Sequence, residues 1–562
     1  MPKIDPHRRR LLGWLSLGTG VAGAIGFARA LPAGMRATVH AIDEPDAGPM
    51  CAQPRATRTS AAQAPTYERF TRPLQLPRED GLLADLDASV PYRFVAQSRD
   101  FAVLPGAPTS LWHYAVQADG RVFANPTLRV KRGESIDVEL DNRLAEATTI
   151  HWHGFVIDEA NDGGGLHPVK AGARARYRFD VRNRAGMYWY HAHPHMRTGV
   201  QVQRGMAGLV VVEDDEEREL QKQLDLVHGK TDLALMLADK QVGADHSILY
   251  REDGADDWVG NAMLVNWTAE PYLDVTPRLY RLRLANVSNA RLLRIAFVQQ
   301  GGGALPFHLI GTDGGLLAEP WRVEDVFLAP AQRIDVLVDF GKLAAGARVR
   351  LRSLAYDAME NDENESGELA PDPMGDHPGA IAMGHALDFM EMRVGEAKEK
   401  SVRRMLPRKL SSLAPTPDAK AWPVRKFRLN MDAQGDWFIN DWNFHKTGHR
   451  NAFEIKRGSR ETWEIQNAIN SMPHAMHLHG FQFRVLSRSI SPPDLRAKQV
   501  APGGLSPQDL GVLDTVVVWP GETVRIALDF AQPFRGTQRY MFHCHNLEHE
   551  DKGMMVTFAV VD

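Results

Sequence analysis

Hydrophobic and polar residues alternate along much of the chain, in short segments separated by turn-forming residues. Residues 129–142 show this two-residue period, which is typical of strands with one buried face. Residues 207–213 form an almost continuous apolar run, as expected for a buried strand. Residues 515–530 are also rich in β-forming residues, and a turn at Pro520-Gly521 interrupts them. Short strands bounded by turns predict an all-β protein built from β-sandwiches.

Two repeated motifs divide the chain into related units. Lys131-Arg-Gly-Glu and Lys456-Arg-Gly-Ser each precede a His-x-His-Gly segment by about twenty residues. A second motif, a short turn followed by a strand that ends near Phe-Asp or Asp-Phe, occurs three times. We therefore predict three β domains of related structure. Their predicted bounds are residues 67–215, 216–395 and 424–562, with a Lys/Arg/Pro-rich linker at residues 396–423.

The middle unit lacks a histidine pair. Its His308-Leu-Ile-Gly311 segment has isoleucine where the outer units have the second histidine. We expect this unit to bind no metal and to act as a spacer. An acidic insertion at residues 356–392 carries methionines that could bind a soft metal ion or fill the core. These methionines are Met359, Met374, Met383, Met390 and Met392.

Composition and charge exclude some functions. The chain has 562 residues, a net charge of −4 and only two cysteines. This length predicts more than one domain, and the mixed charge gives no basis for a nucleic-acid surface. Because Cys544 lies among histidines, we expect no disulfide between it and Cys51. Cys51 is expected to be unpaired in a flexible segment, and a lipoprotein anchor there is a weak alternative.

The first residues have the pattern of an export signal. The basic segment His7-Arg-Arg-Arg precedes a Gly/Ala-rich apolar stretch, and Ala28-Arg-Ala fits a small-x-small cleavage site. Residues 1–30 resemble a twin-arginine signal, with a general secretory signal or a membrane anchor as alternatives. Residues 31–66 predict a flexible lead-in. We expect a periplasmic or secreted protein with no stable membrane association after cleavage.

Four histidine pairs are the strongest chemical signal in the chain. On a strand, residues i and i+2 point to the same face, so each His-x-His pair presents two imidazoles together. Eight imidazoles would fill a multinuclear metal site rather than bind a single zinc ion. Chance clustering explains one such pair but not four at repeated positions. The pairs are His151 and His153, His191 and His193, His477 and His479, and His543 and His545.

A second ligand set lies on the opposite face of the last pair's segment. Residues 540–542 predict a strand that leads into His543-Cys-His545. On such a strand, Cys544 points away from its two histidine neighbours. A thiolate with histidines and a weak methionine ligand is typical of a blue-copper electron-transfer site. The shared strand gives a short covalent route between the two sites. The second site would use His474, Cys544, His549 and Met554, whereas His195 lies outside both sets.

Together these motifs resemble the multicopper oxidases, the family of laccases, ascorbate oxidase, bilirubin oxidase and bacterial cuprous oxidases. The resemblance covers essentially the whole mature chain. It implies three cupredoxin-like Greek-key β-sandwich domains and four copper ions per chain. It also implies that His474, Cys544, His549 and Met554 bind type 1 copper, that His151 and His477 bind type 2 copper, and that His153, His191, His193, His479, His543 and His545 bind the type 3 pair.

The resemblance implies an enzyme that couples four one-electron oxidations at type 1 copper to the reduction of O₂ to water at the other three. It assigns electron transfer between the sites to Cys544. In bacterial members, carboxylates matching Asp162 and Glu550 relay protons, and we expect such acid–base work here. The alternatives are a turn aspartate and a solvated glutamate. Asp514 is expected to be structural.

The sequence indicates the class of the electron donor but not the particular compound. Met554 as the axial ligand suggests a lower potential than Leu or Phe would give. The C-terminal motif resembles the bacterial periplasmic branch, whose members oxidise phenols and aromatic amines or Cu(I). Met472 occupies the position of a Cu(I)-binding methionine in cuprous oxidases, but Asn470 replaces the aspartate expected beside it. The loop at residues 488–510 is predicted either to shape the substrate mouth or to be a plain surface loop.

We expect a monomeric, laccase-like oxidase whose partners are O₂ and a small phenolic or metal-ion donor. The alternatives are a dedicated cuprous oxidase for copper tolerance and an enzyme similar to bilirubin oxidase. A structural protein of three cupredoxin domains is disfavoured by the complete ligand set. A copper-storage protein would bind copper without consuming O₂.

Overall fold

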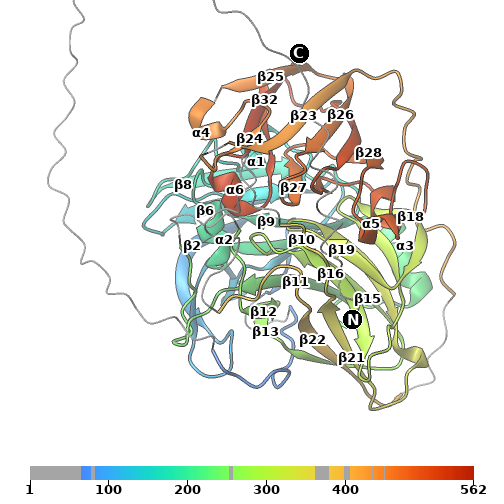
Figure 1. The fold of residues 1–562 in the computed structure, drawn as a ribbon. Helices are drawn as coiled ribbons and strands as arrows, with labels where there is room; N and C mark the ends of the chain where they lie inside the picture. Colours follow the sequence, from blue (N-terminus) through green and yellow to red (C-terminus); the bar gives the residue numbers. More distant parts are fainter. Residues whose placement is uncertain are drawn as a thin grey trace, which may run out of the picture. The chain divides into compact units, whose positions relative to one another are not determined.

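Strands dominate the fold and, among the residues that the structure describes, assemble into six sheets (Figure 1). The computed structural model describes residues 65–77, 83–251, 257–360, 379–397, 405–432, 434–447 and 450–562. The predicted export signal, Cys51 and Met374 lie outside these residues. Within the described ranges, no helix is long and apolar enough to cross a membrane.

The first two sheets come from residues 85–213 and enclose one core. Alternate residues of the strand at Ser135–Asn142 are buried, and Ile136 and Val138 share a core with Leu128 and Val210 of the facing sheet. This is the two-residue period seen in the sequence. One sheet has the order β1 (Asp85–Asp87), β5 (Thr127–Lys131), β10 (Ala207–Glu213), β9 (Gly186–His191) and β7 (His151–His153), and the other has the order β4 (Arg121–Ala124), β3 (Thr109–Ala118), β2 (Tyr92–Phe101), β6 (Ser135–Asn142) and β8 (Arg174–Asp180).

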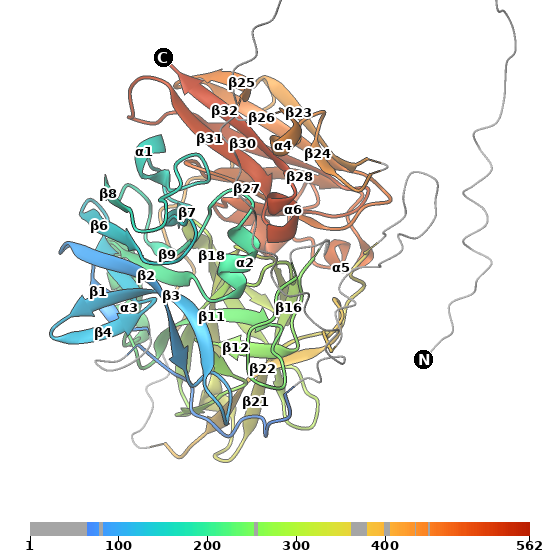
Figure 2. The same ribbon diagram turned by 90° about the vertical axis from the view of Figure 1, so that its left-hand side faces the viewer.

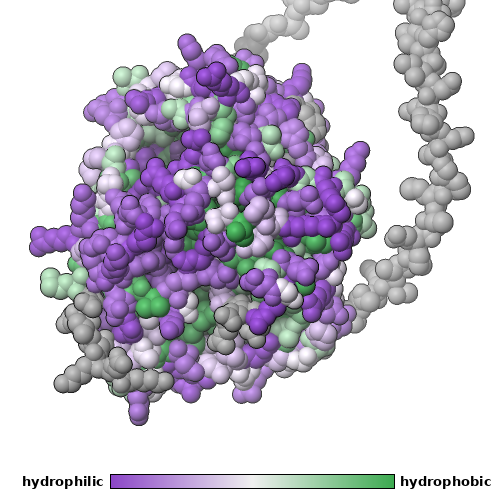
Figure 3. All heavy atoms as spheres, turned by 180° about the vertical axis from the view of Figure 1, so that it is seen from behind, coloured by the Kyte–Doolittle hydropathy of each residue, from purple (hydrophilic) through white to green (hydrophobic). Residues whose placement is uncertain are grey.

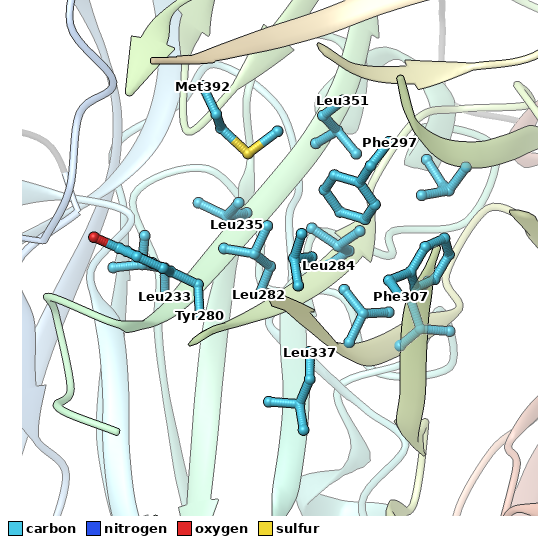
Figure 4. Packing of buried hydrophobic residues seen from close by; sticks show 14 of the residues in the cluster. Leu233, Leu235, Tyr280, Leu282, Leu284, Phe297, Phe307, Leu337, Leu351 and Met392 are labelled. Carbon is cyan, nitrogen blue, oxygen red and sulfur yellow. The ribbon is translucent and has the colours of Figure 1, made fainter. Parts of the chain in front are cut away.

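The middle pair of sheets comes from residues 232–394. Leu282 and Leu284 pack with Phe297 and Leu351 of the facing sheet in a large aliphatic core (Figure 4). The strand orders are β13 (Thr268–Ala269), β12 (Ala262–Val265), β11 (Asp232–Lys240), β15 (Leu279–Asn286), β20 (Arg333–Asp339), β17 (Phe307–Thr312) and β18 (Gly315–Val323), and β14 (Tyr272–Val275), β22 (Leu387–Val394), β21 (Arg348–Ser353), β16 (Leu293–Gln299) and β19 (Asp325–Leu328).

The third pair comes from residues 424–561, a range that carries eight of the twelve predicted ligands. Its core contains Trp463, Ile526 and Phe542, and Cys544 is part of the same cluster. The strand orders are β24 (Trp437–Ile439), β23 (Val424–Met431), β26 (Arg460–Asn467), β30 (Thr523–Asp529) and β28 (Phe483–Ser489), and β25 (Asn451–Lys456), β32 (Met555–Val561), β31 (Gln538–Cys544), β27 (His474–Leu478) and β29 (Thr515–Val518).

One topology recurs in the three pairs. The parallel pairs β2–β6, β11–β15 and β23–β26 each continue into an antiparallel partner, which is β8, β20 or β30. The chain is therefore an all-β protein of three related two-sheet units, as the sequence motifs predicted. The domain bounds themselves stay predictions.

The proposed match of residues 308–311 to the histidine pairs is wrong. These residues lie on β17, which pairs with β20 as β28 pairs with β30. The middle-unit strand in the position of β27 is β16, which lies between β21 and β19 as β27 lies between β31 and β29. The sequence of β16 contains no histidine. The absence of a histidine pair from the middle unit is therefore not explained by one isoleucine in place of a histidine, because the corresponding strand has no histidine at all.

The predicted insertion at residues 356–392 also needs correction at its C-terminal end. Residues from Leu387 onward form β22, and Met390 and Met392 are fully buried in the aliphatic core. These two methionines are core residues rather than candidate metal ligands. Met359 and Met383 are partly buried and pack in a separate cluster beside Trp519.

Short helices connect the sheets and carry functional residues. α3 joins the first unit to the second, and its buried Glu217 pairs with both Arg281 and Arg283 of β15. α2 and α6 lie side by side (Figure 2), because Thr198 and Gly199 donate backbone N–H groups to Asp551. The helices are α1 (Glu159–Asp162), α2 (Thr198–Gln203), α3 (Asp215–Leu224), α4 (Phe444–Thr447), α5 (Pro493–Arg496) and α6 (Leu547–Asp551), with 3₁₀ turns η2 (Phe340–Lys342) and η3 (Pro507–Leu510).

Candidate metal centres

One cysteine and two histidines converge at the edge of the third unit. His474 begins β27, Cys544 ends β31, and α6 presents His549. Cys544 Sγ lies 3.6 Å from His474 Nδ1 and 3.5 Å from His549 Nδ1, and the two nitrogens are 3.2 Å apart. Three ligands about 2.1 Å from one ion in a common plane would be about 3.6 Å apart, so the triangle fits a single metal ion.

Met554 lies next to this triangle. Its carbonyl oxygen accepts the N–H of Cys544 at 3.1 Å, and its own N–H donates to the carbonyl oxygen of His549 at 2.9 Å. Met554 is also fully buried in the same core cluster as Cys544. The chain from α6 into β32 (Met555–Val561) therefore returns the methionine to the backbone of the cysteine.

Three neighbours of the triangle were not found from the sequence. The Trp437 ring packs 4.5 Å from the His549 ring and 4.9 Å from the His474 ring. Asp257 Oδ1 lies 3.4 Å from His549 Nε2, and Ser471 Oγ lies 3.0 Å from His474 Nε2. A lone tryptophan and an aspartate 292 residues before His549 give no sequence signal.

A small pocket adjoins the triangle at the boundary with the middle unit. Its lining includes Asp257, Tyr356, Glu360, Met383, Pro473 and Asn546. The predicted mouth loop at residues 488–510 contributes no lining residue to this pocket among the residues that the structure describes. Met472 is 1% exposed and packs in the core of the third unit instead.

The eight paired histidines meet between the first and third units. They lie on or directly after β7, β9, β27 and β31, and each is at most 1% exposed. The His151 ring stacks on His479 at 4.0 Å, and the His153 ring stacks on His477 at 3.7 Å. These two stacks each join a histidine of the first unit to one of the third.

The remaining four rings close the cluster. His543 Nε2 lies 2.9 Å from His479 Nε2 and 3.4 Å from His193 Nε2. His545 packs 5.0 Å from the His153 ring and 5.3 Å from the His191 ring. All eight predicted residues therefore form one buried group.

His195 lies apart, beside Phe444 and His445, as its place outside the pairs indicated.

Several ring nitrogens of the cluster lack hydrogen-bond partners. His151, His191 and His477 each place Nδ1 within 2.9 Å of a backbone carbonyl oxygen, of Asp162, Ala192 and Asp514 respectively. Their Nε2 atoms are buried without a partner, as are both nitrogens of His545. Buried polar atoms without partners are rare in native proteins and often mark a ligand. The donor set therefore fits bound metal ions.

Burial keeps these imidazoles neutral. It lowers the pKa of His151, His474 and His479 to about 3, and that of His153, His191 and His543 well below the usual value. Neutral imidazole is the form that binds metal, and copper accepts both imidazole and thiolate. The fold and these two ligand groups thus define a copper protein with two kinds of site.

Two carboxylates touch the histidine cluster. Asp162 Oδ2 lies 2.8 Å from His479 Nδ1, and burial raises the pKa of Asp162 to about 6. Glu550 lies 3.3 Å from His193 Nδ1 and 3.4 Å from His543 Nδ1. Burial, followed by the nearby Asp551, raises the pKa of Glu550 well above its ordinary value. Thr198 Oγ1 donates to Glu550 Oε1 at 2.6 Å.

Asp514 is a third carboxylate at the cluster, and no sequence pattern predicts its position there. Its Oδ1 lies 3.1 Å from His153 Nε2, and its side chain is fully buried. The sequence indicates only an aspartate before a strand. The register of β29 against β27 brings it to the histidines.

Comparison with known proteins assigns the chain to a family. Family models described as multicopper oxidase match residues 107–217 and 421–562. A multicopper oxidase of Staphylococcus aureus is 30% identical over 436 residues, covering 76% of this chain and 80% of that protein. The crystal structure of the multicopper oxidase McoA from Aquifex aeolicus is 32% identical with a TM-score of 0.76, covering 87% of this chain and 99% of that one.

A laccase-like multicopper oxidase, CueO of Ochrobactrum sp., is 27% identical with a TM-score of 0.68, covering 87% of this chain and 100% of that chain. The chain belongs to the multicopper oxidase family. It is therefore a copper-dependent oxidoreductase that uses O₂ as its electron acceptor.

Proposed function

We propose that this enzyme is a laccase-like oxidase of phenols or aromatic amines, with one type 1 copper and a cluster of one type 2 and two type 3 coppers. The observation that carries the proposal is the continuity of β31. Cys544 belongs to the three-ligand triangle, and its neighbours His543 and His545 belong to the histidine cluster. One strand therefore connects a site that lies beside a pocket with a site enclosed between the first and third units.

The proposed ligands follow the two groups. His474, Cys544 and His549 would hold type 1 copper, with Met554 as the axial ligand. His151 and His477 would hold type 2 copper. The type 3 pair would be held by His153, His191, His193, His479, His543 and His545.

Bound copper would supply reversible one-electron chemistry and the store of electrons that O₂ reduction requires. The protein supplies orientation, because backbone carbonyls fix the rings of His151, His191 and His477. It also excludes water, since each of the eight histidines is at most 1% exposed.

Asp162 and Glu550 would hold protons beside the cluster. Asp162 carries a raised pKa of about 6, so its Oδ2 can bind and release a proton near neutral pH. Glu550 accepts a hydrogen bond from Thr198 Oγ1 on α2 while both of its oxygens face histidine rings. These contacts suit two groups that deliver protons to the enclosed site.

The residues that line the small pocket beside the triangle suit contact with an organic donor. Tyr356 and Pro473 provide apolar surface, and Asp257 and Glu360 provide acceptors for a phenolic hydroxyl or an amine. The related Ochrobactrum oxidase is described as active towards lignin model compounds.

Oxidation of Cu(I), with a role in copper homeostasis, is the second candidate. Met383 lines the pocket together with the two carboxylates, whereas Met472 is enclosed in the core. A soft thioether beside carboxylates suits a copper ion. An enzyme similar to bilirubin oxidase is a further alternative within the organic class.

Oxygen uptake distinguishes these candidates. Purified enzyme is given a phenol or Cu(I), in wild type and in the Met383→Leu and Met472→Leu variants. The laccase-like proposal predicts phenol-driven uptake in all three proteins. Absence of phenol turnover, with Cu(I) turnover that Met383→Leu abolishes, would replace it by the cuprous oxidase.

We also propose that the enzyme is exported, periplasmic or secreted, and monomeric. The composition of residues 1–30 supports export. On the face drawn in Figure 3, polar residues cover most of the surface and apolar ones are scattered between them, which suits a protein without a large partner interface there. Sizing chromatography of the secreted protein tests the monomer.

A further inference from the structure

The middle unit, which carries no histidine pair, nevertheless contacts the histidine cluster through Arg333. This arginine begins β20 and is 1% exposed. Its guanidinium pairs with Asp514 through two parallel hydrogen bonds, Nη1 to Oδ1 at 2.8 Å and Nη2 to Oδ2 at 2.6 Å. Bidentate pairs of this kind fix both the position and the plane of the carboxylate.

The remaining donors of the Arg333 side chain are also satisfied. Nε donates to the carbonyl oxygen of Met187 at 3.1 Å, Nη1 to that of Ala331 at 2.9 Å, and Nη2 to that of Asp313 at 3.2 Å. A guanidinium has five N–H donors, and here each has an acceptor. Met187 lies on β9 of the first unit, so the arginine contacts all three units.

Asp313 holds the backbone of Asp514. Its Oδ1 accepts the backbone N–H of Arg333 at 2.8 Å. Its Oδ2 accepts the backbone N–H groups of Asp514 at 3.2 Å and Thr515 at 3.3 Å. Arg333 and Asp313 therefore fix the side chain and the backbone of Asp514 at once.

Asp514 in turn contacts one histidine from each outer unit. Its Oδ1 lies 3.1 Å from His153 Nε2, and its carbonyl oxygen lies 2.9 Å from His477 Nδ1. These two rings form the closest stack in the cluster, 3.7 Å apart. With Nε2 of His153 on the carboxylate, its Nδ1 is the buried atom without a partner. For His151, His191 and His477, the free atom is Nε2.

Gly154 shows how closely this pair is packed. A Cβ at Gly154 would lie 2.4 Å from Asp514 Oδ2 and 2.8 Å from Arg333 Nη2, and its φ is +83°. The motif His-Trp-His-Gly therefore needs its glycine, because the side chains of Arg333 and Asp514 pack directly against this position.

We propose that Arg333 is a positioning residue for the copper cluster, through which the middle unit fixes the ring orientations of His153 and His477 by way of Asp514. The inference rests on the proposed ligand roles of these two histidines. Contacts beyond the ligands fix the tautomer and direction of metal-binding rings, and losing one lowers metal affinity by roughly 10- to 100-fold.

The alternative role of Asp514 is that of a ligand, since its oxygen lies among the atoms of His153 and His477 that could hold an ion. Both of its oxygens are already paired with Arg333, which disfavours this role. The test below separates the two.

The experiment compares copper binding in wild type, Arg333→Met, Arg333→Lys and Asp514→Asn with a matched control. The control is Arg283→Met, which removes an equally buried arginine on β15 that forms a bidentate pair with Asp232 and lies outside the cluster. Three measurements report on the cluster: copper per chain, competition with a chelator, and the electron paramagnetic resonance signal of type 2 copper. The visible thiolate–copper absorption reports on the triangle.

Arg333→Met should lose roughly 10- to 100-fold in copper affinity at the cluster and show an altered type 2 signal, with the visible absorption retained. Arg333→Lys should lose less copper affinity, because lysine keeps the positive charge but cannot form the two parallel hydrogen bonds of the guanidinium. Arg283→Met should melt at a lower temperature but keep the wild-type affinity and signal. If Arg333→Met does not fold, the lysine variant decides.

Wild-type affinity and an unchanged type 2 signal in the Arg333 variants would overturn the inference. So would complete loss of one copper in Asp514→Asn while Arg333→Met keeps it, because Asp514 would then be a ligand. A wild-type protein that binds no copper at the histidine cluster would instead refute the proposed function, and the wild-type copper count is therefore measured first.

Discussion

His474 gives a quantitative test of the buried, neutral imidazoles. In the folded, copper-free chain, burial lowers its pKa to about 3 from an ordinary value of 6.5. A group with a lowered folded pKa contributes no penalty above 6.5, where both states are neutral. Below pH 6.5 the unfolded chain binds a proton at this histidine that the folded chain does not bind. The free energy of unfolding therefore decreases as the pH is lowered.

The magnitude follows from the slope of about 1.36 kcal/mol per pH unit for one proton. Between pH 6.5 and about pH 5, His474 alone should lower the free energy of unfolding by about 2 kcal/mol. Replacing it by a non-titrating residue of similar size, His474→Gln, removes this contribution. The variant should therefore gain about 2 kcal/mol relative to wild type on going from about pH 7.5 to about pH 5.

The assay is urea unfolding of the copper-free proteins at both pH values. Ser471→Ala is the matched control, because it removes the hydroxyl beside His474 Nε2 without removing a titratable group. Its stability difference from wild type should be the same at both pH values. If His474→Gln also shows the same difference at both, the histidine is not held neutral by burial and the reasoning fails.

Of four further predictions, three concern residues beside the two sites and one concerns a buried ion pair of the middle unit. Asp257→Asn removes the carboxylate 3.4 Å from His549 Nε2, which should change the stability of oxidised relative to reduced type 1 copper by about 1.5–3 kcal/mol and raise its potential; a redox titration giving an unchanged potential would contradict this. Trp437→Ala should destabilise the protein by about 3–5 kcal/mol and alter the visible absorption, and a shift in melting temperature without a spectral change would limit it to packing. Glu217→Ala should cost about 3–5 kcal/mol in urea unfolding, because it leaves Arg281 and Arg283 underpaired in the core, and a cost below about 1 kcal/mol would show that the remaining carboxylates suffice. Gly154→Ala should reproduce the copper loss of Arg333→Met, whereas normal copper binding would show that the pair can move aside.

The histidine cluster was predictable because its geometry is local. A His-x-His pair on a strand fixes two rings on one face, and Cys544 between His543 and His545 fixes which ligands face away. The short tail through α6 to Met554 is equally local. These features depend on strand period and close spacing, which the sequence displays directly.

The contacts around the ligands were not predictable, because they depend on how the units pack. Asp257 and Arg333 belong to the middle unit. Asp257 lies 292 residues before His549, and Arg333 lies 180 residues after His153 and 144 residues before His477. The mistaken match of residues 308–311 has a related cause. Four residues resembled a motif, but sheet register placed them on β17 rather than in the position of β27. The middle unit, which we expected to act as a spacer, supplies Arg333, whose partner Asp514 contacts the cluster.

In the proposed enzyme, one strand serves two separate copper sites. Copper per chain and visible absorption, measured together in wild type and Cys544→Ser, distinguish the two sites. We expect four copper ions and strong absorption in wild type, and three copper ions without that absorption in the variant, because only the triangle loses a ligand. Retention of the visible absorption in Cys544→Ser, or loss of all four copper ions together, would contradict it.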